Sequence, residues 1–383
     1  MRGLRVVHVF TVPLSLMFLR GQVAFMRERG HELIAVTAPG DGLDAFASRE
    51  GARVHAVPMS RRIAPVEDQR ALRQLVALFR RLRPDIVHAH TPKGGLLGVI
   101  AASFARVPAR IYHMRGLPLV TARGVQKVLL RGTEQTSCRL ATHVLCVSAS
   151  LREEAIRRGL VEPAKARVLA SGSGNGVDAD RRFNPDLVAA GAVRALRERL
   201  GVGDAPLVGF VGRLVHDKGI VELAAAWERI RKRVPRAHLV IGGMFEERDA
   251  VPDHVRAQLE GDSQVHMLGF VEDTATLYRA LDVLAFPSHR EGFPNVVAEA
   301  ASMRVPVVAA RAVGNVDALV DGVTGTLVAV GDAVGLAESL ERYLLDAELR
   351  RTHGVAARER MLNEFRPERV WDALATFYES LVP

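Results

Sequence analysis

Residues 208–219, with the sequence VGFVGRLVHDKG, combine glycines with two cations five positions apart, Arg213 and Lys218. A buried strand is expected to end near Gly212, and a helix to begin near Gly219. Backbone amides at a helix N-terminus attract negative charge, and an arginine can hold two phosphate oxygens at once. The segment therefore indicates a diphosphate-binding loop, although two surface cations beside an ordinary strand–helix turn would give the same pattern.

A second segment, residues 286–300, places Glu291 in a loop and Glu299 on a helix that is expected to begin near Asn295. A loop carboxylate at the end of a strand can bind sugar hydroxyls, and a helical carboxylate can accept both hydroxyls of a ribose. The free amides at the start of the helix can hold phosphate oxygens. Isolated glutamates are common on surfaces, but Gly292 and Pro294 beside Glu291 favour a binding loop.

Two common nucleotide sites are absent from the sequence. No GxxxxGK[ST] segment occurs, and no GxGxxG follows an expected opening strand. ATP hydrolysis and NAD chemistry are therefore not favoured.

The elements that must position these residues alternate between short β-branched runs and amphipathic stretches. In the first half, strands are expected at residues 4–10, 32–37, 53–57, 86–89, 110–113 and 143–148. In the second half, they are expected at residues 207–211, 238–242, 266–268, 283–286, 307–309 and 325–328. Strand–helix alternation of this kind predicts an α/β fold with two Rossmann-like, doubly wound parallel-sheet domains. Ligands of such sheets bind at the carboxyl ends of the strands, so a cleft between the two domains is expected.

The chain of 383 residues is long enough for two such domains. We expect an N-terminal acceptor-binding domain at residues 1–190 and a C-terminal nucleotide-binding domain at residues 191–366. Residues 367–383 carry an apolar stripe formed by Val370, Leu374, Phe377 and Leu381. We expect this terminal helix to pack back on the first domain.

The net charge of +9 is unevenly distributed, with +14 in residues 1–190 and −5 in residues 191–383. A basic half predicts an anionic partner, although a general preference for arginine would give the same excess. Nucleic acid is the weaker candidate, because aromatic residues make up 5% of the chain and no zinc-finger, RRM or helix-turn-helix pattern is present.

The N-terminal segment and the cysteines bear on the compartment. Residues 1–19 resemble a signal peptide, but His8, Pro13 and Arg20 interrupt the apolar stretch and no small-residue cleavage site follows. Cys138 and Cys146 are too few for a disulfide framework and wrongly spaced for a zinc knuckle. We therefore expect a cytoplasmic protein.

The order and spacing of GRLVHDKG and EGFPNVVAE resemble those of the retaining glycosyltransferases of family 4, which have the two-domain GT-B fold. Residues 175–178, 269–271 and 321–328 add weaker matches. Within the family, residues 88–98 and 110–117 are similar to the CapM-like and PglA-like group that assembles bacterial glycans. The resemblance covers essentially the whole chain.

The resemblance implies roles for individual residues. The catalytic set is Glu291, Arg213, Lys218, His113 and Arg115, with His113 or Arg115 in place of a histidine that many members carry before the glycine of that segment. The donor-binding set is Gly212, Arg213, Lys218, Gly243, Phe270, Val271, Glu291, Phe293, Pro294, Asn295, Val296 and Glu299. The acceptor-binding set is Gly21, His90, Lys93, Arg115 and Asn175.

His88 and His90 are expected on one strand face, which would suit a metal ion. No acidic residue accompanies them in a ligand pattern, and Lys93 is close. The GT-B resemblance also implies catalysis without a bound metal. We therefore expect no metal and no other cofactor.

The resemblance implies transfer of a sugar from a nucleotide donor, with UDP favoured, to a lipid-linked or glycan acceptor in capsule, O-antigen or related polysaccharide synthesis. An anionic membrane surface is a further expected partner, because arginines gather before and along one predicted helix: Arg61, Arg62, Arg70, Arg73, Arg80, Arg81 and Arg83. A solvated helix face would look the same. The alternatives are a UDP-sugar 2-epimerase of the same fold and a non-enzymatic polyanion-binding protein.

Overall fold

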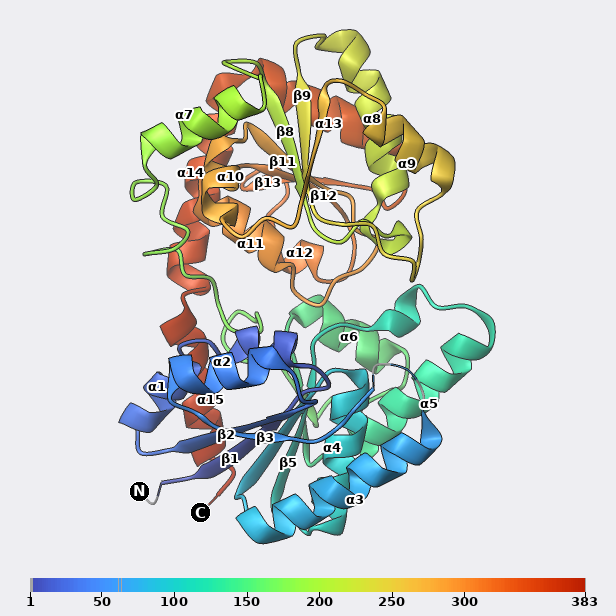
Figure 1. The fold of residues 1–383 in the computed structure, drawn as a ribbon, viewed down its shortest axis with the longest axis vertical. Helices are drawn as coiled ribbons and strands as arrows, with labels where there is room; N and C mark the ends of the chain where they lie inside the picture. Colours follow the sequence, from blue (N-terminus) through green and yellow to red (C-terminus); the bar gives the residue numbers. More distant parts are fainter. Residues whose placement is uncertain (1–2, 61, 63, 383) are drawn as a thin grey trace. The chain divides into compact units, whose positions relative to one another are not determined.

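The computed structural model describes residues 3–60, 62 and 64–382. The chain divides into two compact units, which we describe separately (Figure 1). Unit 1 comprises residues 1–176 and 367–383, and unit 2 comprises residues 177–366.

Unit 1 is built on a parallel sheet whose strand order is β3-β2-β1-β4-β5-β6-β7. The strands are β1 (Arg5–Val9), β2 (Glu32–Thr37), β3 (Arg53–Ala56), β4 (Ile86–His90), β5 (Ala109–Met114), β6 (His143–Cys146) and β7 (Ala166–Arg167). The helices are η1 (Pro13–Leu19), α1 (Gln22–Glu28), α2 (Asp41–Glu50), α3 (Pro65–Leu82), α4 (Pro92–Phe104), η2 (Pro118–Val120), α5 (Gly124–Leu140), α6 (Ala149–Arg157) and α15 (Pro367–Glu379).

Unit 2 is built on a second parallel sheet, in the order β10-β9-β8-β11-β12-β13. Its strands are β8 (Leu207–Val211), β9 (His238–Gly242), β10 (Val265–Gly269), β11 (Val283–Phe286), β12 (Val307–Ala310) and β13 (Gly325–Val328). Its helices are α7 (Ala190–Arg199), η3 (His216–Lys218), α8 (Ile220–Arg233), α9 (Asp253–Glu260), α10 (Thr274–Ala280), α11 (Asn295–Ser302), α12 (Asn315–Ala318), α13 (Ala333–Leu345) and α14 (Ala347–Glu364).

These two sheets confirm the predicted fold class. Most of their strands are buried on both faces, as strands are when helices cover both sides of a parallel sheet, whereas the edge strands β3, β7 and β10 are partly exposed. Strand order reverses between β1 and β4 in unit 1 and between β8 and β11 in unit 2. In open α/β sheets this reversal is where ligands bind, so it selects one region of each unit.

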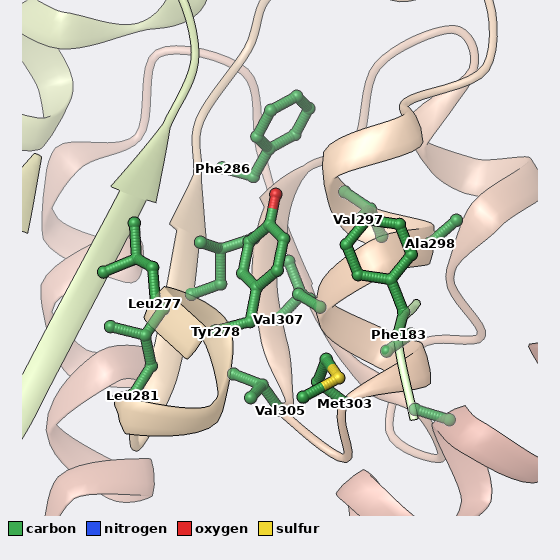
Figure 2. Close-up of a cluster of buried hydrophobic side chains, with 14 of the residues drawn as sticks. Phe183, Leu277, Tyr278, Leu281, Phe286, Val297, Ala298, Met303, Val305 and Val307 are labelled. Carbon is green, nitrogen blue, oxygen red and sulfur yellow. The ribbon is translucent and has the colours of Figure 1, made fainter. Parts of the chain in front are cut away.

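The core of unit 2 shows what holds that region in place (Figure 2). Tyr278 from α10 is fully buried, with its aromatic ring among Leu277, Leu281 and Val307. Phe183 packs against Tyr278, with their ring centroids 6.2 Å apart. The sheet and helices α10 and α11 are thereby tied into one rigid support for the loops above them.

The boundary between the units differs from the expected one. Residues 177–190, assigned from the sequence to the first domain, lie in unit 2. Val177, Ala179 and Phe183 are buried in the unit 2 core, which explains why the boundary falls after Gly176. Helix α15 belongs to unit 1 and contacts α1, because its apolar stripe is buried there.

Two glycines let helix α4 lie directly on the unit 1 sheet. A Cβ atom on Gly95 would come within 2.3 Å of the Tyr112 ring on β5. A Cβ atom on Gly98 would come within 2.8 Å of Ala89 on β4. The glycines of the residue 88–98 segment thus serve close packing of the helix on the sheet.

Candidate functional site

An ion pair between Lys218 and Glu291 lies at the reversal of strand order in unit 2. Lys218 ends the short η3 helix that follows β8, and Glu291 lies in the loop after β11. The Ser288 hydroxyl donates a second hydrogen bond to the same carboxylate oxygen over 2.6 Å. The two charged side chains are 18% and 14% exposed, so neither could be left unpaired without a desolvation cost. The structure therefore joins the two predicted motifs.

Glycines without room for a side chain bring these loops together. Gly219, with φ of 73°, would place a Cβ atom 2.2 Å from the Pro287 carbonyl oxygen. Gly314, with φ of 86°, would place one 2.6 Å from the Gly292 carbonyl oxygen. The positions of Lys218 and Glu291 thus depend on direct backbone contact between their loops.

Arg213 does not converge with Lys218 in this structure. Its guanidinium donates to Glu246 over 2.9 Å, and its side chain is 58% exposed. Gly212 and Gly243 explain the close approach of these strand ends, because a Cβ atom on Gly243 would come within 1.8 Å of the Gly212 carbonyl oxygen. Arg213 therefore lies just after β8 in an exposed ion pair with Glu246, and a more strongly binding anion can replace the Glu246 carboxylate.

The predicted base-binding residues, Phe270 and Val271, follow the end of β10. Gly243 donates its amide to the Gly269 carbonyl over 2.7 Å, which joins the ends of β9 and β10. Phe270 is 79% exposed, whereas Val271 packs on the unit 2 core. Phe270 thus offers an unburied ring within two residues of the sheet edge.

Glu299 lies on α11, and its Oε2 atom accepts a hydrogen bond from the Tyr278 hydroxyl over 2.9 Å. Burial raises the pKa of Glu299 to about 7, although the bond from Tyr278 acts in the opposite direction. Helix α11 begins at Asn295, as predicted, and the amides of Val297 and Ala298 already donate to the Pro294 carbonyl, so the amides of Asn295 and Val296 are the ones that precede its first hydrogen bond. Phe293 packs on Phe365 with ring centroids 4.9 Å apart, which fixes the approach to this helix. Pro294 is its N-cap residue, and Val296 packs partly on the core.

Sequence reasoning missed a second layer of charged pairs around Lys218. Arg290 donates to Asp217 over 2.6 Å, and the His289 ring lies 2.9 Å from Glu222. The hydrogen bond to Glu222 raises the pKa of His289. Asp217 and Arg290 each adjoin a predicted site residue in the chain, and that adjacency was the only available signal.

Unit 1 contains a buried cluster of four histidines at its own reversal of strand order. The register places His8 beside His88 and His90 beside His113, on strands β1, β4 and β5. All four rings are less than a tenth exposed. Burial, the largest cause, lowers the pKa of each ring, in the case of His8 to about 3. These rings are therefore neutral at physiological pH.

Arg115 and Tyr378 complete this cluster. The Arg115 Nε donates to His90 Nδ1 over 3.1 Å, and the Tyr378 hydroxyl lies 2.5 Å from His88 Nδ1. His113 and Arg115 thus share one cluster, as strand alternation predicts. His8 and Tyr378 were not among the predicted site residues, since only the strand order and the return of α15 bring them here.

The other predicted acceptor-binding residues lie in two places in unit 1. Lys93 pairs with Asp68 over 2.7 Å at the start of α4. The Asn175 side chain donates to the Arg20 carbonyl and accepts from the indole of Trp371. Gly21 lies against the same indole, since a Cβ atom there would come within 2.6 Å of it.

Among the described residues, two groups of three have the side chains to hold a metal ion: His8, His88 and His90, and His216, Asp217 and His289. His8 Nδ1 lies 3.0 Å from His90 Nε2, and His88 Nδ1 lies 2.5 Å from the Tyr378 hydroxyl. In the second group, Asp217 is paired with Arg290 and His289 with Glu222. Both groups thus have protein partners where an ion would bind.

Comparisons with known proteins identify the family. Residues 205–346 match the family model "Glycosyl transferases group 1", and residues 17–172 match "Glycosyl transferase 4-like domain". The capsular polysaccharide biosynthesis glycosyltransferase CapM of Staphylococcus aureus is 33% identical over 384 aligned positions, which cover 100% of this chain and 98% of CapM. The chain belongs to the group 1 glycosyltransferases. The resemblance to family 4 and its CapM-like group is thereby confirmed.

Further relatives of this glycosyltransferase extend the comparison. A galactosyltransferase of Escherichia coli, named for UDP-Gal and α-D-GlcNAc-diphosphoundecaprenol, is 26% identical, covering 87% of this chain and 85% of its own. The crystal structure of Anabaena HepE with UDP-glucose has a TM-score of 0.81 at 22% identity, covering 98% of this chain and 100% of HepE. These structural likenesses confirm the GT-B fold.

An epimerase also shares this fold. A putative UDP-N-acetylglucosamine 2-epimerase of Listeria monocytogenes has a TM-score of 0.66 at 16% identity, covering 100% of this chain and 99% of its own. That likeness extends to the fold alone, whereas both family models are those of transferases. The comparisons therefore favour the expected transferase over the epimerase alternative.

The close contact at Gly314 can be tested through stability. Gly314→Ala should destabilise unit 2 by at least about 2 kcal/mol, because the added Cβ must displace the loop that carries Glu291. Gly322→Ala is the matched control, since Gly322 has a similar φ of 71° and nothing within 4 Å of its added Cβ. Denaturant unfolding measures both variants, and equal losses would contradict the loop-contact account.

Proposed function

We propose that this glycosyltransferase moves a sugar from a UDP-sugar to a lipid-linked or glycan acceptor in capsular or related polysaccharide synthesis, with retention of configuration and without a bound metal. The observation that carries the proposal is the Lys218–Glu291 pair at the strand-order reversal of unit 2. The names of the Staphylococcus and Escherichia relatives, and the UDP-glucose complex of HepE, supply the substrate class.

A nucleoside diphosphate sugar matches both halves of this ion pair. Its diphosphate can form an ion pair with the ammonium of Lys218, while its sugar hydroxyls donate hydrogen bonds to the Glu291 carboxylate. Arg213 can exchange its exposed partner Glu246 for the same diphosphate. Lys218 thus exchanges one anion for another, while Glu291 exchanges the ammonium for hydroxyl donors and keeps its hydrogen bond from Ser288.

The proposed reaction breaks the bond between the sugar C1 and the diphosphate oxygen and forms a bond from C1 to an acceptor hydroxyl oxygen. Negative charge accumulates on the departing diphosphate, where Lys218, Arg213 and the first-turn amides of α11 stabilise it. The acceptor attacks from the side that the diphosphate leaves, so its hydroxyl proton passes to a phosphate oxygen. Glu291 orients sugar hydroxyls and forms no covalent bond.

The residues at the strand ends would hold the rest of the nucleotide. Glu299 accepts hydrogen bonds from the two ribose hydroxyls, and Gly243, directly after β9, lies beside the diphosphate. Phe270 and Val271 lie where the base would bind. A lipid-linked or glycan acceptor would meet unit 1 near Gly21, Lys93, Asn175 and the cluster at Arg115.

A membrane surface is the proposed third partner, at the cytoplasmic face. The arginines of α3 that the structure describes are exposed, as are Arg62 and Arg83 beside it, whereas Arg61 lies outside the described residues. Helix α5, which shares the neighbour α4 with α3, begins with exposed apolar side chains at Val125, Val128 and Leu129. Apolar groups with basic neighbours are typical of surfaces that bind anionic lipid. No helix in the described part of the chain combines the length and hydropathy needed to cross a bilayer.

Transfer is tested with a panel of UDP- and GDP-sugars, by measuring nucleotide release with and without lipid-linked acceptor. Lys218→Ala and Arg213→Ala should each lower kcat on the order of 10²-fold, because each removes charge stabilisation of the leaving group. Lys232→Ala and Arg256→Ala are exposed controls in the same unit and should keep normal turnover. Near-normal turnover in both site variants would refute the assignment. An epimerised donor would indicate the 2-epimerase, and polyanion binding without donor turnover the non-enzymatic alternative.

The raised pKa of Glu299 predicts how donor affinity varies with pH. A protonated carboxyl cannot accept hydrogen bonds as a carboxylate does, and its pKa of about 7 means that protonation prevails below that pH. Affinity for UDP-glucose should therefore rise about tenfold from about pH 6 to about pH 8. Calorimetric titration measures it, and Glu299→Gln should flatten the profile. Parallel profiles in the two proteins would exclude Glu299 from the ribose site.

The membrane partner is tested by sedimentation with vesicles of equal parts phosphatidylglycerol and phosphatidylcholine. Val128→Ser with Leu129→Ser should weaken vesicle binding at least about tenfold, because two exposed apolar side chains no longer enter the interface. Val330→Ser with Leu345→Ser removes two exposed apolar side chains from unit 2 and is the control. Binding that is equal in both variants, or insensitive to salt, would contradict this membrane surface.

A further inference from the structure

Six buried or partly buried groups of unit 1 form an unbroken series of polar contacts. From the Arg115 end, Arg115 Nε lies 3.1 Å from His90 Nδ1, and His90 Nε2 lies 3.0 Å from His8 Nδ1. His8 Nε2 then lies 3.4 Å from the Tyr378 hydroxyl. Each histidine in this part of the series uses both of its ring nitrogens.

The series continues from the hydroxyl group of Tyr378. This oxygen lies 2.5 Å from His88 Nδ1, and His88 Nε2 lies 3.0 Å from His113 Nδ1. His113 Nε2 has no hydrogen-bond partner among the described residues, and His113 retains 7% exposure at the carboxyl end of β5. The series therefore ends at the sheet edge where ligands of such folds bind.

The rings are neutral, which limits each of them to one donor and one acceptor. Desolvation lowers the pKa of all four, and the nearby Arg115 guanidinium lowers it further. Tyr378 also keeps its proton, because burial raises its pKa. Choosing one proton position at either end therefore determines all the others.

Arg115 determines the proton position at its end of the series. A guanidinium Nε–H can only donate, so His90 Nδ1 must be the acceptor and His90 carries its proton on Nε2. That proton points to His8 Nδ1, so His8 in turn carries its proton on Nε2. The Tyr378 oxygen accepts from His8 and has one proton to donate.

Tyr378 transmits the direction to the second pair of rings. Its proton goes to His88 Nδ1, which leaves His88 protonated on Nε2 and donating to His113 Nδ1. His113 then carries its own proton on Nε2, at the open end. The opposite direction would require Arg115 to accept a hydrogen bond, which it cannot do.

We infer that Arg115 and Tyr378 are positioning residues that fix the direction of the hydrogen bonds in this series. His113 thereby presents an Nε2–H donor to an oxygen of the bound substrate. This role rests on the proposed function, since a sugar transfer supplies hydroxyl oxygens at this edge. His90 then belongs to the support of the site, because both its nitrogens are engaged inside the protein. Tyr378 gives the terminal helix α15 a part in the site as well as in packing.

The tautomers can be read directly by long-range ¹H–¹⁵N correlation NMR on the full chain with ¹⁵N-labelled histidine, without any donor present. The four resonances are assigned by single His→Gln variants. His8, His88, His90 and His113 should all be neutral and protonated on Nε2 near pH 7.5. A proton on Nδ1 of any of the four would overturn the inference, whatever the transfer assay shows.

Tyr378→Phe tests the transmission of direction. His8 and His90 should keep the Nε2–H form, because Arg115 still orients them, while His88 and His113 should show a new population protonated on Nδ1. Tyr343→Phe is the matched control, since it removes another buried hydroxyl, 2.8 Å from His353 Nδ1 in unit 2. Unchanged His88 and His113 tautomers in Tyr378→Phe would overturn the inference.

Kinetics separate this inference from the proposed function. If transfer is confirmed, Tyr378→Phe should lower kcat on the order of tenfold with little change in the KM for donor, and Tyr343→Phe should not. If the protein shows the predicted tautomers but transfers no sugar, the proposed function is refuted, whereas the direction of the hydrogen bonds in the series is established. Active enzyme with normal kcat in Tyr378→Phe would overturn the positioning role.

Discussion

The ion pair between Lys218 and Glu291 is the interaction on which the proposed donor site depends. Each group is mostly removed from solvent, so each needs the other, and both lie where the strand order of unit 2 reverses. The cost of removing either partner is large, because an uncompensated charge would remain in a desolvated place. A ligand can enter such a site only by offering an anion and hydroxyl donors together. A sugar attached to a diphosphate has both, and this match is the basis of the proposed substrate class.

Unit 1 also buries titratable side chains, but these are neutral. Four imidazoles on β1, β4 and β5 would be unstable as cations in this interior, and their hydrogen bonds let them remain neutral with every ring nitrogen partnered by a described residue except His113 Nε2. The cluster also needs Arg115 and Tyr378, which reach it from a strand end and from the terminal helix. Because α15 supplies the Tyr378 hydroxyl, the terminal helix takes part in this cluster as well as in the packing of unit 1.

Much of this structure could be predicted from the sequence. Strands such as β8, β9 and β11 were placed at the correct residues, because buried parallel strands are short apolar runs with clear ends. The start of α11 at Asn295 was also predicted, as was the place of Lys218 and Glu291 at strand ends. Helix α6 and the two-residue β7 were missed, since a short edge strand and a polar helix carry little periodic signal.

What the sequence could not provide depends on register and on side-chain choice. Glu299 meets Tyr278, and Arg213 meets Glu246, through partners that no motif identifies. His8 interrupts the apolar N-terminal stretch, but its contacts with His90 and Tyr378 follow only from the strand order. The domain boundary differs from the expected one because Val177, Ala179 and Phe183 are buried in the core of unit 2, and burial of a loop is not visible in its composition.

A crystal structure of the chain with bound UDP tests the central claim most directly. The account predicts that the diphosphate lies beside residues 212–219, with Lys218 turned from Glu291 to the phosphates and the ribose hydroxyls on Glu299. A nucleotide bound elsewhere, or one that leaves the Lys218–Glu291 pair intact, would contradict it.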